Sequence, residues 1–213
     1  MRTLAILGDS YSTYYGFIPA DYEAWYQPGN NSESNDVTAP EQTWWWQLCQ
    51  AGQLQLVANC SYSGSTVCNT GYFGLNESKT SFITRMQREL SSSLNSPDIL
   101  LVFGGTNDYW AGSPIAYEKY ADWTSEDLNA FAPAFCYMMD YLSKTHSSSK
   151  IYNIINDDIT GPVREWMLRI CNHFDIPCIL LEHIEKENGH PNQIGMTQIH
   201  QQIATALSLP LSK

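Results

Sequence analysis

Two residues that could act together as a nucleophile and its base lie near opposite ends of the sequence. Ser10 ends the motif Gly8-Asp9-Ser10, and His190 begins the motif His190-Pro191-Asn192. A serine hydroxyl is a poor nucleophile until a base removes its proton, and histidine is the side chain best suited to do so near neutral pH. The two motifs therefore predict nucleophilic catalysis, provided that the fold brings Ser10 and His190 together.

Each motif by itself has a simpler interpretation, because a lone Ser10 would more often cap a helix and a lone His190 would more often face solvent. Two further segments lie between them, Gly64 after a second apolar run and Gly105-Thr106-Asn107-Asp108 after a third. The four segments, in this order, closely resemble the four blocks of the SGNH (GDSL-type) hydrolase family of esterases and lipases. The resemblance spans nearly the whole chain.

The resemblance implies a role for one residue of each block. Ser10 is the expected nucleophile, and His190 is the expected general base that later acts as the acid. The backbone N–H groups of Ser10 and Gly64 and the side-chain amide of Asn107 are the expected oxyanion hole. The site would then bind the negative charge that develops on the carbonyl oxygen of an ester.

The residue that orients the histidine is where the sequence departs from the family pattern. The family usually has an aspartate three residues before the histidine, whereas Glu187 stands at that position. A glutamate can orient an imidazole, but its extra methylene requires a shifted loop. We therefore predict Glu187 as the third catalytic residue and keep Glu185 and a backbone carbonyl as alternatives. We expect Asp9 and Asp108 to hold loops in place.

Aromatic residues gather in the sequence around the predicted site. Tyr11 follows the nucleophile, Trp44-Trp45-Trp46 are consecutive, and Tyr109 and Trp110 come just after the third block. Aromatic faces bind sugar rings and acyl groups while their polar tips tolerate water. We predict that Tyr11, Trp45, Tyr109 and Trp110 contact the substrate, although packing beneath long loops would account for about half of the aromatic residues.

Short apolar runs alternate with helix-length segments along the chain. The runs are 4–7, 54–57, 99–103, 151–155 and 178–181, and the helix-length segments are 43–50, 81–94, 128–146, 163–174 and 193–207. Such alternation predicts a parallel sheet whose strands are buried on both faces and covered by helices. The predicted fold class is α/β, a three-layer α/β/α sandwich with a flavodoxin-like five-stranded parallel sheet, the fold of SGNH hydrolases.

The length of 213 residues fits one α/β domain, so we expect a single domain over 1–213. Two segments, 11–42 and 111–126, are too long for ordinary connections in a compact domain. They are rich in Tyr, Trp, Pro, Asn and Gly. We therefore expect functional loops or lids in both places.

The charge balance argues against some macromolecular partners, and the cysteines and histidines argue against a metal site. The net charge is -11, with 11 Lys and Arg against 22 Asp and Glu, which argues against nucleic acid and against anionic membrane surfaces. The six cysteines form no C-x-x-C pair, so buried free thiols are expected. The histidines show no ligand spacing, and we expect neither a metal nor a cofactor. The oligomeric state stays open, with a dimer reasonable if tryptophans are exposed.

The N-terminus bears on the cellular compartment. Residues 1–7 lead directly into the nucleophile motif and leave no room for a signal peptide. As numbered, the sequence indicates a cytoplasmic protein, and a periplasmic or secreted one if a signal peptide had been removed.

These observations predict a serine esterase that hydrolyses a carboxylic ester through an acyl-enzyme. A carbohydrate acetyl esterase is favoured, and a short-chain acylhydrolase competes with it, so the expected partner is a small ester or an acylated saccharide. The alternative is a non-catalytic carbohydrate-binding relative with the same fold, which only Glu187 supports. Nucleotide binding is disfavoured, because Tyr11-Ser12-Thr13-Tyr14 rather than a glycine-rich loop follows the first strand.

Overall fold

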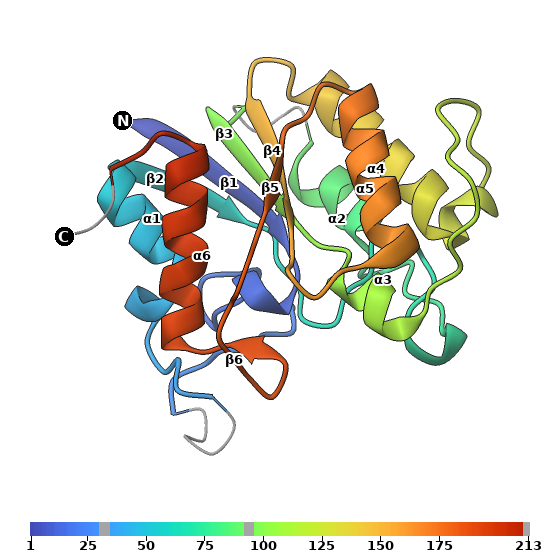
Figure 1. Ribbon diagram of the computed structural model, residues 1–213. Coiled ribbons are helices and arrows are strands. Elements are labelled where there is room, and N and C mark those ends of the chain that lie inside the picture. Colours follow the sequence, from blue (N-terminus) through green and yellow to red (C-terminus); the bar gives the residue numbers. More distant parts are fainter. Residues whose placement is uncertain (30–34, 92–95, 211–213) are drawn as a thin grey trace.

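A five-stranded parallel sheet forms the centre of the protein, as a computed structural model shows for residues 1–29, 35–91 and 96–210 (Figure 1). The strand order is β2-β1-β3-β4-β5, the flavodoxin-like order. The strands are β1 (Arg2–Gly8), β2 (Leu54–Asn59), β3 (Ile99–Phe103), β4 (Lys150–Ile155) and β5 (Cys178–Leu180). The predicted α/β fold class is confirmed.

Helices cover both faces of the sheet (Figure 1). Leu4 and Ile6 pack with the helices of one face, and the alternating residues Ala5 and Leu7 pack with those of the other, so β1 is buried on both sides. The first face carries α1 (Trp44–Gly52) and α6 (Gln193–Ala206), and the second carries α2 (Phe82–Glu89), α4 (Phe131–Thr145) and α5 (Gly161–His173). Among the described residues, no helix is long and apolar enough to cross a bilayer.

Several short elements were not predicted from the sequence. They are α3 (Thr106–Ala111), the hairpin of β6 (Lys186–Glu187) and β7 (His190–Pro191), and the 3₁₀ turns η1 (Ser10–Ser12), η2 (Pro40–Gln42), η3 (Tyr72–Gly74) and η4 (Asp127–Asn129). None of these elements is long enough to show a hydrophobic period. The predicted helix 81–94 ends earlier, at Glu89, and its positions 92–94 lie outside the described residues.

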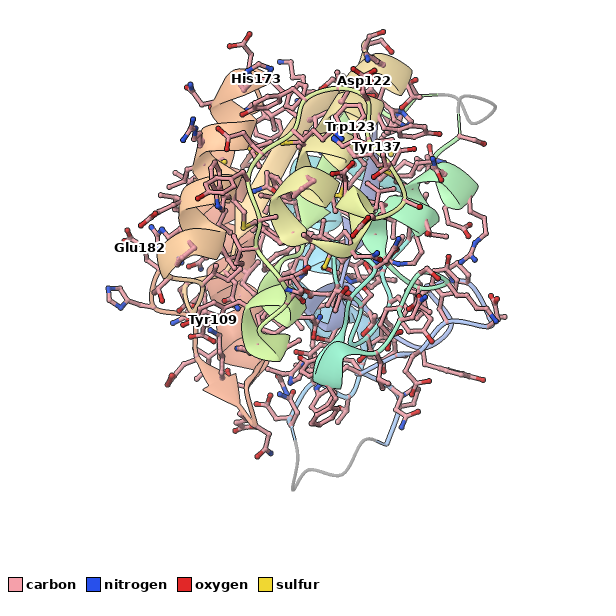
Figure 2. All side chains as sticks on the ribbon, turned by 90° about the vertical axis from the view of Figure 1, so that its right-hand side faces the viewer. Tyr109, Asp122, Trp123, Tyr137, His173 and Glu182 are labelled. Carbon is pink, nitrogen blue, oxygen red and sulfur yellow. The ribbon has the colours of Figure 1, made fainter. Side chains whose placement is uncertain are left out.

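The two long segments take different paths. Positions 30–34 of the segment 11–42 lie outside the described residues, and Tyr11 and Tyr26 of this segment donate hydrogen bonds to the hairpin that carries His190. The segment 111–126 leads away from α3, and Figure 2 shows Asp122 and Trp123 at the end of the molecule far from Tyr109. The Trp123 ring packs against Tyr137 of α4, with 5.4 Å between centroids. This far part of the segment 111–126 therefore packs against α4 and lies away from Tyr109.

The sheet places two of the sequence motifs side by side at the carboxyl ends of neighbouring strands. Gly8 at the end of β1 is in register with Phe103 at the end of β3, and the N–H of Asp9 donates to the carbonyl oxygen of Phe103. Ser10 and Asn107 follow these two strand ends directly. In doubly wound α/β sheets the strand order reverses between such strands, and the crevice there is the usual place for a ligand.

Candidate active site

The structure brings Ser10 and His190 into hydrogen-bonding contact. Ser10 is the first residue of η1, whose preceding residue, Asp9, accepts a hydrogen bond from the N–H of Tyr11 at 3.1 Å. Nε2 of His190 lies 2.9 Å from Oγ of Ser10. The two side chains are nearly enclosed, since Ser10 is 3% exposed and His190 is 8% exposed. This geometry allows the imidazole to take the hydroxyl proton directly.

A tight turn sets the tautomer of His190. Asn188 and Gly189 connect β6 to β7 with φ values of +49° and +75°, the left-handed pair typical of a type I′ hairpin. The carbonyl oxygen of Asn188 lies 3.1 Å from Nδ1 of His190. Because a carbonyl can only accept, Nδ1 must carry the hydrogen, which leaves Nε2 free to accept a proton from Ser10. The Asn-Gly dipeptide was the sequence signal for this turn.

The carbonyl oxygen of Asn188 therefore occupies the position that we expected for Glu187. Glu187 is exposed and stands opposite His190 in the β6–β7 ladder. Within the described residues, no carboxylate forms an ion pair with His190. Glu185 contributes its backbone elsewhere, donating to Oε1 of Gln198 and accepting from the N–H of Asn192. Of the three predicted ways to orient the imidazole, the geometry fits the backbone carbonyl.

Aromatic rings surround the imidazole of His190. The indole of Trp25 lies parallel to it, with 3.6 Å between ring centroids and 9° between planes. The rings of Tyr11 and Trp110 follow at 5.5 Å and 6.0 Å. Burial lowers the pKa of His190 to about 4, and the positive charge of Lys186 acts in the same direction. Trp25 was missed because nothing in its spacing separates it from the other aromatic residues of its loop.

The N-terminal loop holds the backbone of the histidine hairpin. The hydroxyl of Tyr11 donates to the carbonyl oxygen of Gly189 at 2.7 Å, and that of Tyr26 donates to the carbonyl oxygen of Pro191 at 2.8 Å. Nδ2 of Asn35 donates to the carbonyl oxygens of His190 and Pro191. Tyr11 is fully buried. This placement corrects the expectation that Tyr11 contacts substrate, because its side chain is used to fix the hairpin.

The side-chain amide of Asn107 has a fixed orientation. Asn107 lies in the first turn of α3, which begins after Gly105 at φ +87°. Its Nδ2 donates to the carbonyl oxygen of Ser65 at 3.0 Å, and its Oδ1 accepts from the hydroxyl of Tyr72 at 2.8 Å. The amide NH₂ has two hydrogens, so one remains for a ligand. Tyr72 was missed because it lies 35 residues from its partner.

Gly64 has a backbone conformation that favours glycine. Its φ is +80°, a value that residues other than glycine rarely adopt, and a Cβ built at this position would have no atom within 4 Å. The backbone at Gly64 is thus open on the side where a larger residue would project.

Residues 2–207 match the model of the GDSL-like lipase/acylhydrolase family. The chain belongs to this family. It is similar to solved structures described as GDSL-like lipases, from Bacteroides uniformis at 46% identity and from Bacteroides ovatus at 41% identity, each with a TM-score of 0.92. The matches cover 98% of this chain, and 96% and 98% of those chains. The protein is a hydrolase that acts on esters.

More distant solved structures share the fold alone. An acetyl xylan esterase from Butyrivibrio proteoclasticus is 16% identical with a TM-score of 0.63, and the match covers 97% of this chain and 63% of that one. A family two carbohydrate esterase from Clostridium thermocellum is 13% identical with a TM-score of 0.65, over the same shares of the two chains. None of the curated proteins matches this chain.

A buried arginine joins the loops of the hydrolase site. Nη2 of Arg85, on α2, donates to the carbonyl oxygen of Gly8 at 3.0 Å and to Oγ of Ser65 at 2.7 Å, while Nη1 donates to the carbonyl oxygen of Cys60. The end of β1, the end of β2 and the Gly64 loop thus share one guanidinium. Burial lowers the pKa of Arg85 to about 10. Arg85 could not be predicted from the sequence, because a charged residue in an amphipathic helix is expected to face solvent.

The two aspartates of the motifs hold loops. The carboxylate of Asp108 accepts hydrogen bonds from the N–H groups of Val67 and Cys68 at 2.7 Å and 3.3 Å. Burial raises the pKa of Asp108 to about 6 and that of Asp9 to about 7. Neither carboxyl group bonds to the imidazole of His190, whose Nδ1 and Nε2 already have partners.

The remaining aromatic residues divide between core and rim. Trp45 is 1% exposed and packs against Phe17, so its placement corrects the expectation that it contacts substrate. Tyr109 and Trp110 on α3 are each 37% exposed. The hydroxyl of Tyr109 lies 3.0 Å from Oγ1 of Thr160, and Figure 2 shows Tyr109 on α3. Tyr109 and Trp110 remain available to a substrate, whereas Trp45 does not.

Proposed function

We propose that this hydrolase is a serine esterase that removes short acyl groups, acetyl in particular, from carbohydrates. The observation that carries the serine mechanism is the 2.9 Å contact between Nε2 of His190 and Oγ of Ser10, with Nδ1 directed at a carbonyl oxygen. A base in this tautomer and at this distance is what an activated serine needs. Glu187 has no part in this proposal.

The reaction has two halves. Oγ of Ser10 attacks the ester carbonyl carbon while its proton passes to Nε2 of His190, and the carbonyl π electrons move onto the oxygen. The imidazolium then gives that proton to the departing alcohol oxygen as the C–O bond breaks, which leaves an acyl group on Ser10. In the second half, water loses a proton to Nε2 of His190 and attacks the acyl carbon. The bond between that carbon and Oγ of Ser10 then breaks, and the imidazolium returns the proton to Oγ. The products are a carboxylic acid and free Ser10.

The oxyanion is stabilised by three donors, namely the backbone N–H groups of Ser10 and Gly64 and the side chain of Asn107. The fixed amide of Asn107 supports this assignment, because Ser65 and Tyr72 hold it in place before the charge develops. Donors that need no reorganisation are the ones that lower a barrier most.

Two observations support a short acyl group on a carbohydrate. Ser10 and Asn107 are each only 3% exposed, so little space leads to the reacting atoms. Tyr109 and Trp110, on the same short helix as Asn107, are partly exposed, and the Trp110 ring lies 6.0 Å from the ring of His190; such aromatic faces suit sugar rings. The fold is also that of the acetyl xylan esterase and the family two carbohydrate esterase.

Hydrolysis of p-nitrophenyl acetate, butyrate and octanoate, together with acetyl release from acetylated xylan oligomers, tests the proposal. We expect acetate to be the best ester and Ser10→Ala or His190→Ala to lower kcat by at least about 10⁴-fold. Ser147→Ala, at an exposed serine, is the matched control. Turnover that does not depend on Ser10 would refute the serine mechanism, and no turnover at all would favour the non-catalytic carbohydrate-binding alternative. Preference for octanoate would refute the short acyl group.

A further inference from the structure

The imidazole of His190 faces a neutral acceptor where a serine triad has a carboxylate. Its Nδ1 donates to the carbonyl oxygen of Asn188. The carboxylates of Asp157 and Asp158 are both paired with Lys186, at the base of the same hairpin. In the described parts of the chain, the imidazolium that forms during proton transfer therefore has no anion of its own. Some other group has to favour its charge.

The indole of Trp25 is placed to supply that attraction. Its ring lies 3.6 Å from the imidazole ring and within 9° of parallel. The negative π face of a tryptophan attracts a cation held within about 6 Å, and the attraction is stronger where water is excluded. His190 is 8% exposed, so water is largely excluded here.

We propose that Trp25 is a positioning residue that stabilises the imidazolium form of His190 through its indole face, in place of the carboxylate of a triad. The inference rests on the proposed serine mechanism, because that mechanism is what makes His190 carry a proton. The interaction is weak while the imidazole is neutral and strengthens as Ser10 loses its proton. It therefore lowers the barrier more than it stabilises the resting state.

The backbone around Trp25 is anchored on both sides of the site. The N–H of Trp25 donates to Oγ1 of Thr13 at 2.9 Å. The carbonyl oxygen of Glu23 accepts from the N–H of Ser63, next to Gly64, at 2.9 Å. The next residue, Tyr26, donates its hydroxyl to the histidine hairpin. The indole is thus held before the reaction rather than recruited during it.

The charged and aromatic groups around His190 do not replace Trp25. Lys186 of β6 is the charged side chain that acts on the imidazole, and it disfavours the imidazolium. Its ammonium group is paired with Asp157 and Asp158, which reduces that effect. Tyr11 lies 5.5 Å away with its ring tilted by 60°, so its face is not parallel to the imidazole as the face of Trp25 is.

A purely space-filling role for Trp25 predicts a different result from the proposed one. Leucine in place of Trp25 keeps an apolar cover over the imidazole but has no π face. If the indole only excludes water, Trp25→Leu leaves the pKa of His190 unchanged, or raises it towards its ordinary value as water enters. If the indole attracts the imidazolium, the same change lowers the pKa of His190.

We would therefore measure the pKa of His190 by ¹⁵N NMR of histidine-labelled protein, with the resonance assigned from His190→Gln, and kcat and KM with p-nitrophenyl acetate. For Trp25→Leu we expect the pKa to fall by about 0.5 to 1 unit and kcat to fall about threefold to tenfold, with KM within about twofold. Trp25→Phe is expected to lie between Trp25→Leu and the wild type, because phenylalanine has a weaker π face.

Trp166→Leu on α5 is the matched control, because it removes another half-buried indole that a cation contacts, here the guanidinium of Arg169 at 5.1 Å. It is expected to change neither the pKa of His190 nor kcat. An unchanged or raised pKa in Trp25→Leu overturns the inference, as does a raised KM with unchanged kcat, which would mark Trp25 as a substrate contact. If the wild type showed no turnover that depends on Ser10, the proposed function would instead be refuted. The NMR titration would still show whether the indole of Trp25 favours the imidazolium form of His190.

Discussion

The two halves of the candidate site are held by different kinds of group. On the nucleophile side, which comprises Ser10, Gly64 and Asn107, buried charged side chains hold the loops through hydrogen bonds to the backbone. Arg85 binds the carbonyl oxygen of Gly8, and the aspartates of the motifs accept backbone hydrogen bonds. On the histidine side, which comprises the β6–β7 hairpin with His190, the supports are a carbonyl oxygen, tyrosine hydroxyls and aromatic faces.

The difference follows from what each half has to do. The nucleophile side must hold backbone N–H groups and an amide rigidly against a developing negative charge, and a guanidinium that binds several carbonyl oxygens is well suited to that. The histidine side must keep its imidazole neutral until it takes a proton. Burial, together with the positive charge of Lys186, lowers the pKa of His190 to about 4 and so keeps the base unprotonated.

Among the changes that test the difference between the two sides, Asn107→Ala is expected to have the largest effect on kcat. We expect kcat to fall about 100- to 1000-fold with KM little changed, because a donor to the oxyanion is lost. Tyr72→Phe should cost only about tenfold, since Ser65 still holds Nδ2 of the amide. Steady-state kinetics with p-nitrophenyl acetate measure both. Equal losses in the two variants would show that Tyr72 does more than orient Asn107.

The pH dependence of activity tests the neutral environment on the histidine side. Because His190 must be unprotonated to act as a base, kcat/KM should rise with pH through the pKa of about 4 and be level above about pH 5. An ordinary histidine would place this rise near about pH 6.5. Circular dichroism at each pH separates loss of activity from unfolding. A rise centred near pH 6.5 would contradict the argument that burial controls this group.

Removal of the buried charge tests the nucleophile side. Arg85→Met leaves the carbonyl oxygens of Gly8 and Cys60 without their shared donor, so we expect the free energy of unfolding to fall by about 2 to 4 kcal/mol. Urea denaturation measures it. Arg88→Met is the control, because Arg88 is on the same helix, is half exposed and pairs with Glu89, and its loss should cost less than about 1 kcal/mol. If Arg85→Met and Arg88→Met lowered the free energy of unfolding by similar amounts, Arg85 would not be the special support of the nucleophile side.

The smallest effect is expected from Glu187→Gln. The carbonyl oxygen of Asn188 already occupies the position at Nδ1 of His190, and Glu187 is exposed. We therefore expect kcat to stay within about twofold of the wild type, a change of about 0.4 kcal/mol in the barrier. A loss of about 100-fold or more would restore Glu187 as the residue that orients His190.

The sequence predicted the elements whose signal is local. The strand β3 is a continuous apolar run and β1 contains one at 4–7, and Ser10 and Asn107 come soon after these strands end. Their position at the carboxyl ends of neighbouring strands could therefore be inferred from parallel strands alone. The hairpin that carries His190 could also have been found, because Asn188-Gly189 is the usual dipeptide of a type I′ turn. What misled the prediction there was the family pattern, which directs attention to the side chain of Glu187.

The supporting residues could not be predicted, because their partners are distant in the sequence. Trp25 stacks on a residue near the other end of the chain, and Tyr72 and Arg85 act on loops that only the fold brings near. Tyr11 shows the opposite error, since an aromatic residue beside a nucleophile suggested a substrate contact. Its hydroxyl instead reaches the carbonyl oxygen of Gly189, 178 residues away.

The hydrogen bond between Ser10 and His190 spans 180 residues of sequence, and this has a consequence for folding. Helices form from contacts between near neighbours, whereas this contact needs the first strand and the last hairpin to meet, which costs loop-closure entropy and time. Ester hydrolysis should therefore return later than helical circular dichroism when the unfolded protein is diluted from urea. In this molecule, enzymatic turnover reports that the two ends of the described chain have come together.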